Sequence, residues 1–268
     1  MLTTTKLKEM KQNKEKITMV TAYDYPSAKH AETAGVDTIL VGDSLGMVVL
    51  GYDSTTQVTL DDMIHHAKAV RRGAKNTFVV VDMPFMTYHA SIEKAIENAT
   101  KLFQASDAQA IKIEGASKET LELTRRLTEG GIPVVGHLGL TPQMVNVLGG
   151  YRVQAKQEDA IEKLRQDALQ YEANGAIAVV LECIPKEIGE QVTEELDIPT
   201  IGIGAGAACD GQVLVYHDLL QYGGERYPKF VKHYANFNQY GTKAIQNYVD
   251  EVKSGSFPLE EHTYTVHK

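Results

Sequence analysis

Residues 38–46 read Thr38-Ile39-Leu40-Val41-Gly42-Asp43-Ser44-Leu45-Gly46 and place an acid directly after a short apolar run. Branched apolar residues in such a run are typical of a strand that is buried on both faces. Gly42 ends the run, and Asp43 and Ser44 follow it before a loop begins. The sequence therefore predicts a buried strand that delivers polar groups at its carboxyl end.

Four later strand-like runs are followed by a polar group in the same way: by Asp82, Glu114, His137 and Glu182. A single acid after a single strand means little. The carboxyl ends of parallel strands in a barrel meet at one face, so five such strands predict one shared site.

Predicted strands and helices alternate in about eight units of roughly 25–35 residues, which is the spacing of a (β/α)8 barrel. A doubly wound open sheet alternates in the same way and is the alternative fold. The barrel is favoured because polar groups end at least five strands, whereas an open sheet places its site at one switch point. The predicted strands are residues 17–22, 38–41, 77–81, 110–113, 132–136, 176–181, 199–203 and 212–216.

We expect one domain over residues 1–268, with a barrel core of about 17–221 and a C-terminal extension over 222–268. A short N-terminal helix is expected to close one barrel end, and residues 242–252 have helical periodicity. Residues 140–152 form a long, glycine-containing loop, which is typical of a mobile cover over a site.

Composition excludes several classes of function. The net charge of −8 argues against a nucleic-acid partner. No apolar run approaches the roughly 18 residues of a membrane span, and the lysine-rich start has no apolar segment typical of a secretory signal. The only cysteines, Cys183 and Cys209, lack metal-binding spacing. A reducing cytoplasm is the expected setting.

Asp43, Asp82 and Glu114 are oxygen donors that end consecutive strands. Neighbouring strands lie about 5 Å apart, so the three side chains can converge on one ion. Carboxylates without adjacent histidine or cysteine favour Mg²⁺ over Zn²⁺. The alternative is that these acids cap the helices that follow them.

Lys112 lies two residues before Glu114, so both side chains point to the same face of the strand. A desolvated lysine can act as a Schiff-base nucleophile, but nearby acids would hold this one charged. Binding an anion or stabilising an enolate is therefore favoured. A structural ion pair with Glu114 is the remaining alternative.

Glu182 follows an apolar strand, and desolvation would raise its pKa and make it a better general base. A helix cap or a salt bridge is the alternative role. His137 can orient a substrate or a carboxylate, or it can be a satisfied buried histidine. Cys183 is expected on the opposite side of the strand, and no paired base marks it as a nucleophile.

Six motifs in order make the chain resemble the ketopantoate hydroxymethyltransferase family from Thr18 to about Glu261. They are residues 41–46, 82–86, 112–115, 136–143, 181–183 and 202–206. Ala116 departs from the second glycine that is common in the family, and residues 207–209 are variable. Neither departure touches the acids.

The resemblance implies a (β/α)8 barrel of the phosphoenolpyruvate/pyruvate type and the first step of pantothenate biosynthesis. That step transfers a hydroxymethyl group from 5,10-methylenetetrahydrofolate to 3-methyl-2-oxobutanoate. It implies Mg²⁺ at Asp43, Asp82 and Glu114, ketoacid binding by Asp43, Ser44, Asp82 and Lys112, and Glu182 as the base. It also implies a cytoplasmic homodecamer.

Two other functions are compatible with the same residues. A related barrel lyase or mutase would use the same metal and enolate chemistry but would need no folate. A non-catalytic barrel would bind ketoacid and metal without exchanging a proton.

Overall fold

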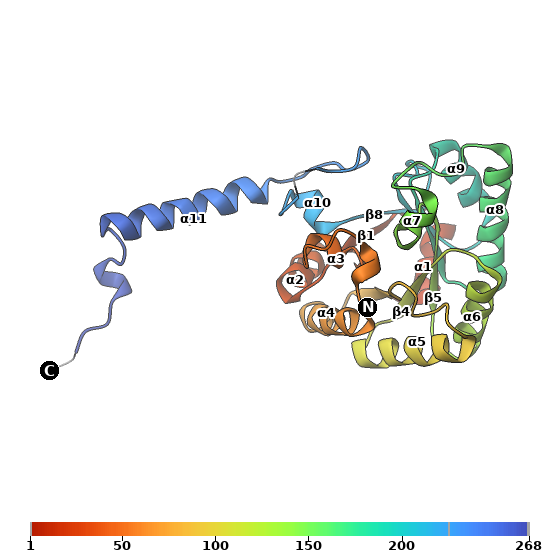
Figure 1. Cartoon of the computed structure of the whole chain (residues 1–268), viewed down its shortest axis with the longest axis horizontal. Coiled ribbons are helices and arrows are strands. Elements are labelled where there is room, and N and C mark those ends of the chain that lie inside the picture. The colour runs from red at the N-terminus through yellow and green to blue at the C-terminus, as the bar shows by residue number, and fades with distance from the viewer. Residues whose placement is uncertain (1, 225, 267–268) are drawn as a thin grey trace.

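The computed structural model describes residues 2–224 and 226–266 of the chain. Within these residues, eight parallel strands follow one another in sequence order and β8 pairs with β1, which closes a barrel (Figure 1). This pairing confirms the predicted barrel and excludes the open sheet, whose outermost strands would stay unpaired. The strands are β1 (Ile17–Thr21), β2 (Thr38–Val41), β3 (Phe78–Asp82), β4 (Ala110–Glu114), β5 (Val134–Gly139), β6 (Ala178–Glu182), β7 (Thr200–Ile203) and β8 (Gly211–Leu214).

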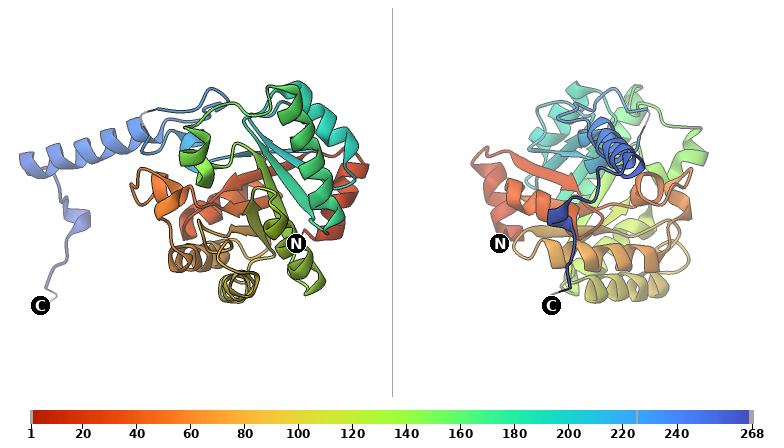
Figure 2. Two further views of the ribbon diagram at one scale, coloured as in Figure 1. Left: turned by 45° about the vertical axis from the view of Figure 1, so that its right-hand side comes forward. Right: turned by 90° about the vertical axis from the view of Figure 1, so that its left-hand side faces the viewer.

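Helices between successive strands cover the outside of the barrel (Figure 2). The longer ones are α2 (Tyr25–Ala34), α4 (Leu60–Gly73), α5 (Ile92–Ser106), α6 (Lys118–Glu129), α8 (Glu158–Ala173) and α9 (Lys186–Glu195). The shorter ones are α3 (Leu45–Val48), η1 (Thr55–Gln57), η2 (Pro142–Met144) and α7 (Val145–Leu148), and α10 (Tyr216–Leu220) follows β8. The predicted loop over residues 140–152 thus contains η2 and α7.

Side-chain caps determine where several helices begin. The Asp24 carboxylate accepts from the backbone N–H of Ser27 and caps α2, which begins at Tyr25. Thr59 and Asp62 form a capping box at the start of α4.

Three strands carry their terminal polar residue inside the sheet. Asp82 pairs with Lys112, Glu114 pairs with His137, and Glu182 pairs with Gly139. The strands therefore extend further toward their carboxyl ends than predicted, and the site residues are held by the ladder rather than by loops.

Alternation along each strand separates the barrel interior from the layer under the helices. Val79 and Val81 of β3 pack against the helices, whereas Phe78 and Val80 belong to the apolar cluster inside the barrel. Asp82 continues the inward series at the carboxyl end of β3. The same alternation turns the polar ends of β4, β5 and β6 into the barrel mouth.

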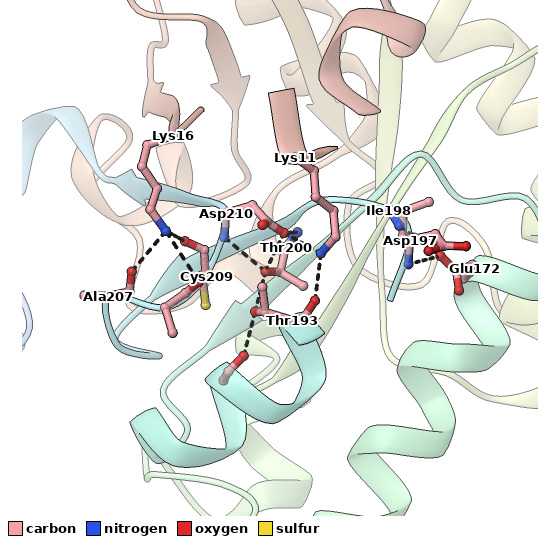
Figure 3. Close-up of polar contacts among 12 residues, drawn as sticks. Lys11, Lys16, Glu172, Thr193, Asp197, Ile198, Thr200, Ala207, Cys209 and Asp210 are labelled. Atoms are coloured by element: carbon pink, nitrogen blue, oxygen red, sulfur yellow. Dashed lines mark hydrogen bonds and ion pairs between the residues drawn. The ribbon is translucent and has the colours of Figure 1, made fainter. Parts of the chain in front are cut away.

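The N-terminal helix α1 (Thr4–Gln12) closes the opposite end of the barrel, as the sequence predicts. Its Leu7 and Met10 are buried in the interior cluster. Figure 3 shows how Lys11 fastens it: the ammonium donates to the Thr193 carbonyl at 2.7 Å and to Asp210 Oδ2 at 2.8 Å. Asp210 Oδ2 also accepts from the backbone N–H of Thr200 at 2.9 Å.

The C-terminal extension leaves the barrel. Helix α11 (Phe237–Ser254) projects away from it (Figures 1 and 2). None of the residues of α11 is buried against the described part of the chain. The helix begins five residues before the predicted 242 because the Asn236 side chain caps it. A short turn, η3 (Glu260–His262), follows. No helix among the described residues is long and apolar enough to cross a membrane.

Candidate functional site

The polar carboxyl ends of the strands line one cavity of about 1100 Å³. The cavity brings together every site residue that the sequence predicts: Asp43, Ser44, Asp82, Lys112, Glu114, His137 and Glu182. Its walls include Tyr151 and Val153 from the loop before α8, and residues 226–230 from the segment after α10.

Lys112 lies at the floor of this cavity among acids. Its Nζ is 3.1 Å from Asp82 Oδ1 and 3.9 Å from Glu114 Oε1, and its side chain is 4% exposed. Burial disfavours the ammonium, but the carboxylates of Asp82, Glu114 and Asp43 outweigh it and raise the pKa of Lys112. A lysine held charged is suited to bind an anion and unsuited to attack as a free amine.

His137 bridges two acids from neighbouring strands. Its Nδ1 is 3.2 Å from Glu114 Oε1, and its Nε2 is 3.2 Å from Glu182 Oε2. Burial and the Lys112 ammonium oppose protonation, but the two carboxylates outweigh them and raise the pKa of His137 to about 9. The raised pKa favours the charged ring, whose attraction for Glu182 is electrostatic, since Nε2 makes no hydrogen bond with the described residues. On the other side of the ring, Lys112 Nζ lies 3.0 Å from Nδ1.

Glu182 is the acid nearest the open part of the cavity, since 15% of its side chain stays exposed. Its carbonyl packs tightly against Gly139, where an added Cβ would lie 2.2 Å from that oxygen. Gly139 has a φ of +90°, which favours glycine at this position.

Cys183 also lines the cavity, so its predicted place on the opposite side of the strand is wrong. Its φ of +51° ends the alternation of β6 directly after Glu182. Burial and the neighbouring Glu182 raise the pKa of the Cys183 thiol, which makes it a poor nucleophile.

The three predicted metal ligands are buried and close enough to interact electrostatically. Burial and the charges of Asp82 and Glu114 raise the pKa of Asp43 well above its usual value. Burial also raises the pKa of Asp82 against the opposing effect of Lys112. Burial works in the same direction at Glu114, but His137 and Lys112 lower its pKa overall.

The acids provide oxygen ligands that suit a divalent cation, but they do not form a complete set of ligands by themselves. Within residues 2–224 and 226–266, no three histidine, cysteine, aspartate or glutamate side chains are grouped to hold a metal. One reason is that Glu114 directs Oε1 toward His137 and receives the Gln143 backbone N–H on Oε2. Asp82 Oδ1, in contrast, is buried and has the Lys112 ammonium, 3.1 Å away, as its charged neighbour. Mg²⁺ commonly binds one or two carboxylates and completes its shell with water and substrate oxygens.

Several residues that hold the site were not singled out from the sequence. Tyr23 is buried and its hydroxyl lies 2.8 Å from Ser44 Oγ. Gln143 and Tyr88 form a hydrogen-bonded group with Asp43. Gln143 stands in the motif of residues 136–143, but its spacing of 100 residues from Asp43 gives no local signal.

Solved structures with this fold include phosphoenolpyruvate phosphomutase from Streptomyces platensis subsp. rosaceus, with a TM-score of 0.62 and 15% identity over 98% of this chain and 92% of that one. Another is 2,3-dimethylmalate lyase, a member of the PEP mutase/isocitrate lyase superfamily, with a TM-score of 0.59 and 17% identity over 98% of this chain and 93% of that one. At such identities the likeness shows the fold alone, which is the (β/α)8 barrel.

Two relatives share much more sequence, and both are named 3-methyl-2-oxobutanoate hydroxymethyltransferase. The one from Geobacillus kaustophilus (strain HTA426) is 63% identical over 257 residues, covering 96% of this chain and 92% of its own. The one from Exiguobacterium sp. (strain ATCC BAA-1283 / AT1b) is 60% identical over 263 residues, covering 98% and 94%. The family model described as ketopantoate hydroxymethyltransferase matches residues 1–260. The chain therefore belongs to the ketopantoate hydroxymethyltransferase family.

Proposed function

We propose that this chain transfers a hydroxymethyl group from 5,10-methylenetetrahydrofolate to 3-methyl-2-oxobutanoate, giving 2-dehydropantoate in the first step of pantothenate biosynthesis. Relatives at 60–63% identity carry the name of this activity. The observation that carries the proposal is the buried group of Lys112 and His137 among the acids at the cavity floor. Such a site suits an anionic substrate that must lose a proton from carbon.

The ketoacid is proposed to bind at Asp43, Ser44, Asp82 and Lys112. The raised pKa of Lys112 supports this role, because a permanent ammonium attracts the carboxylate and stabilises charge on the ketone oxygen. The hydrogen bond with Tyr23 holds the Ser44 hydroxyl in place beside that floor.

Mg²⁺ is the cation that we propose for this site, with Asp43 and Asp82 as ligands and Glu114 as the third acid. Support comes from the burial of Asp43 and Asp82 in the cavity and from the all-oxygen character of the set. A divalent cation supplies Lewis-acid polarisation of the ketoacid oxygens, which is worth several kcal/mol.

Glu182 is proposed as the general base. It removes the proton from the ketoacid carbon beside the ketone and holds it on a carboxylate oxygen, while His137 keeps the carboxylate in position. The resulting enolate carbon then forms a bond to the methylene carbon of the folate. That methylene carbon is bonded to two folate nitrogens: one C–N bond breaks as the new C–C bond forms, and the other breaks when water supplies the hydroxyl group of the product. The proton held by Glu182 and the second proton of the water end on the two folate nitrogens.

The folate is proposed to occupy the outer part of the cavity. A volume of about 1100 Å³ exceeds what a five-carbon ketoacid fills. Arg226 and Lys229 line this outer part and add positive charge, which complements the carboxylates at the glutamate end of a folate.

We further propose an assembly, a location in the cell and a domain organisation for the chain. The homodecamer receives support from α11, whose Tyr240, Ile245 and Tyr248 are all exposed. The cytoplasmic setting is supported by the free thiols of Cys183 and Cys209. We also retain one domain over residues 1–268.

One assay tests the reaction directly. The purified chain is incubated with 3-methyl-2-oxobutanoate, 5,10-methylenetetrahydrofolate and Mg²⁺, and 2-dehydropantoate is measured by mass spectrometry. The proposal predicts product only when all three are present. Conversion of the ketoacid without folate would instead support a lyase or mutase, and absence of product with intact folding would refute the proposal.

A further inference from the structure

Gln143 is buried at the point where the loop after β5 meets the cavity floor. It is 4% exposed and belongs to η2, directly after the Thr141-Pro142 pair. Both the oxygen and the nitrogen of its side-chain amide have hydrogen-bond partners.

The side chain of Gln143 contacts three groups that follow two neighbouring strands, β2 and β3. Its Nε2 donates to Asp43 Oδ2 at 2.8 Å, after β2, and to the Met83 carbonyl at 3.0 Å, after β3. Its Oε1 accepts from the Tyr88 hydroxyl at 2.7 Å. Two oxygen acceptors on one side and a hydroxyl donor on the other fix the orientation of the amide.

The backbone of Gln143 reaches a fourth group. Its N–H donates to Glu114 Oε2 at 3.0 Å, at the end of β4. One residue therefore fixes Oδ2 of Asp43 and Oε2 of Glu114. The other oxygen of Glu114 faces His137 at 3.2 Å.

We propose that Gln143 is a positioning residue that orients the Asp43 carboxylate for the cation and ties the covering loop to Asp43 and Glu114. This inference rests on the proposed function. Groups that hydrogen-bond to ligating carboxylates set their orientation, and losing such a group typically lowers metal affinity 10–100-fold. The loop that Gln143 begins also carries Tyr151 and Val153, which line the cavity. Losing the anchor is therefore expected to raise the KM for the ketoacid as well.

The test compares two glutamine substitutions of the same kind at opposite ends of the barrel. Gln143→Met keeps the side-chain length and removes the amide. Gln109→Met is the matched control: Gln109 precedes β4, accepts from Val79 N–H at 2.9 Å and donates to the Asp107 carbonyl at 3.1 Å. Each variant is titrated with Mg²⁺ by calorimetry without substrates, and its thermal unfolding is recorded without metal.

We expect Gln143→Met to weaken Mg²⁺ binding about 10–100-fold, while Gln109→Met binds like the unchanged chain. Wild-type affinity in Gln143→Met, or an equal loss in Gln109→Met, would overturn the inference. If the unchanged chain itself binds no Mg²⁺, the proposed function fails before the inference is reached.

Tyr88→Phe provides the second variant if Gln143→Met does not fold. It leaves both donors of Gln143 and removes only the hydroxyl that fixes the amide, so we expect a smaller loss of Mg²⁺ affinity in the same direction. In the double variant the Tyr88 effect should vanish, because Tyr88 acts through Gln143. Unchanged affinity in Tyr88→Phe, or additive losses in a folded double variant, would contradict this chain of contacts.

Discussion

Replacing Lys112 by methionine removes the only cation in direct contact with Asp82 that the described residues provide. The two side chains are 4% and 3% exposed, and Nζ lies 3.1 Å from Oδ1. At that distance the attraction is about 5 kcal/mol with an effective dielectric constant near 20. Removing one partner of a buried pair typically costs about 3–5 kcal/mol. We expect the lower end, about 3 kcal/mol, because a neighbouring carboxylate can take up a proton once the ammonium is gone.

Urea unfolding at pH 7.5 measures this change, and a fall in Tm of about 6–12 °C should accompany it. The matched control is Lys101→Met, which breaks a 2.8 Å pair with Asp61 whose side chains are 56% and 82% exposed. That exposed pair should cost less than about 0.5 kcal/mol. Equal stability losses in the two variants would refute the view that Lys112 neutralises a buried acidic group.

Three further predictions concern the base, the cavity mouth and pH. Glu182→Gln should keep ketoacid binding but slow exchange of the C–H proton with deuterium by about 10²–10⁴-fold, and undiminished exchange measured by NMR would remove Glu182 from the base role. Lys229→Glu should raise the KM for methylenetetrahydrofolate about fivefold, equivalent to ~1 kcal/mol, with proton exchange of the ketoacid unchanged; a shift in exchange instead would place Lys229 at the ketoacid. Burial raises the pKa of Asp218 to about 6, above its unfolded value, so the free energy of unfolding should fall as pH rises from about 4 to about 6. The Asp218→Asn variant lacks this titration, so its free energy of unfolding relative to the unchanged chain should rise between pH 4 and pH 7. We expect a rise of only about 1 kcal/mol, because Asp218 is partly exposed. If urea unfolding shows the same difference between the two proteins at both pH values, the prediction is wrong.

The barrel fold and the set of residues that line the cavity could be predicted, because both follow from the pattern of apolar and polar residues along each strand. An apolar run with a polar residue at its end gives the strand, its direction and the face on which the polar residue lies. Asp43, Asp82 and Glu114 therefore reach the same cavity as Glu182, as predicted. The inward alternation of Val80 and Asp82 is a property of the strand itself.

The contacts between loops could not be predicted in this way. Gln143 meets Asp43 only because η2 folds back over the strand ends, and that conformation depends on the packing of the whole barrel mouth. The positive φ of Cys183 and the start of α11 at Phe237 depend on single local contacts that periodicity does not register.

We propose that the acids and Lys112 at the barrel mouth, together with a divalent cation, allow the proton on the carbon beside the ketone of a ketoacid to exchange with solvent. The most direct measurement follows the signal of the C3 proton of 3-methyl-2-oxobutanoate by NMR in D2O, with the protein present and without folate. We predict loss of the signal with Mg²⁺, no loss in excess chelator, and recovery of exchange when Mg²⁺ is restored. Exchange at the same rate in excess chelator, or none with Mg²⁺ present, would contradict the account.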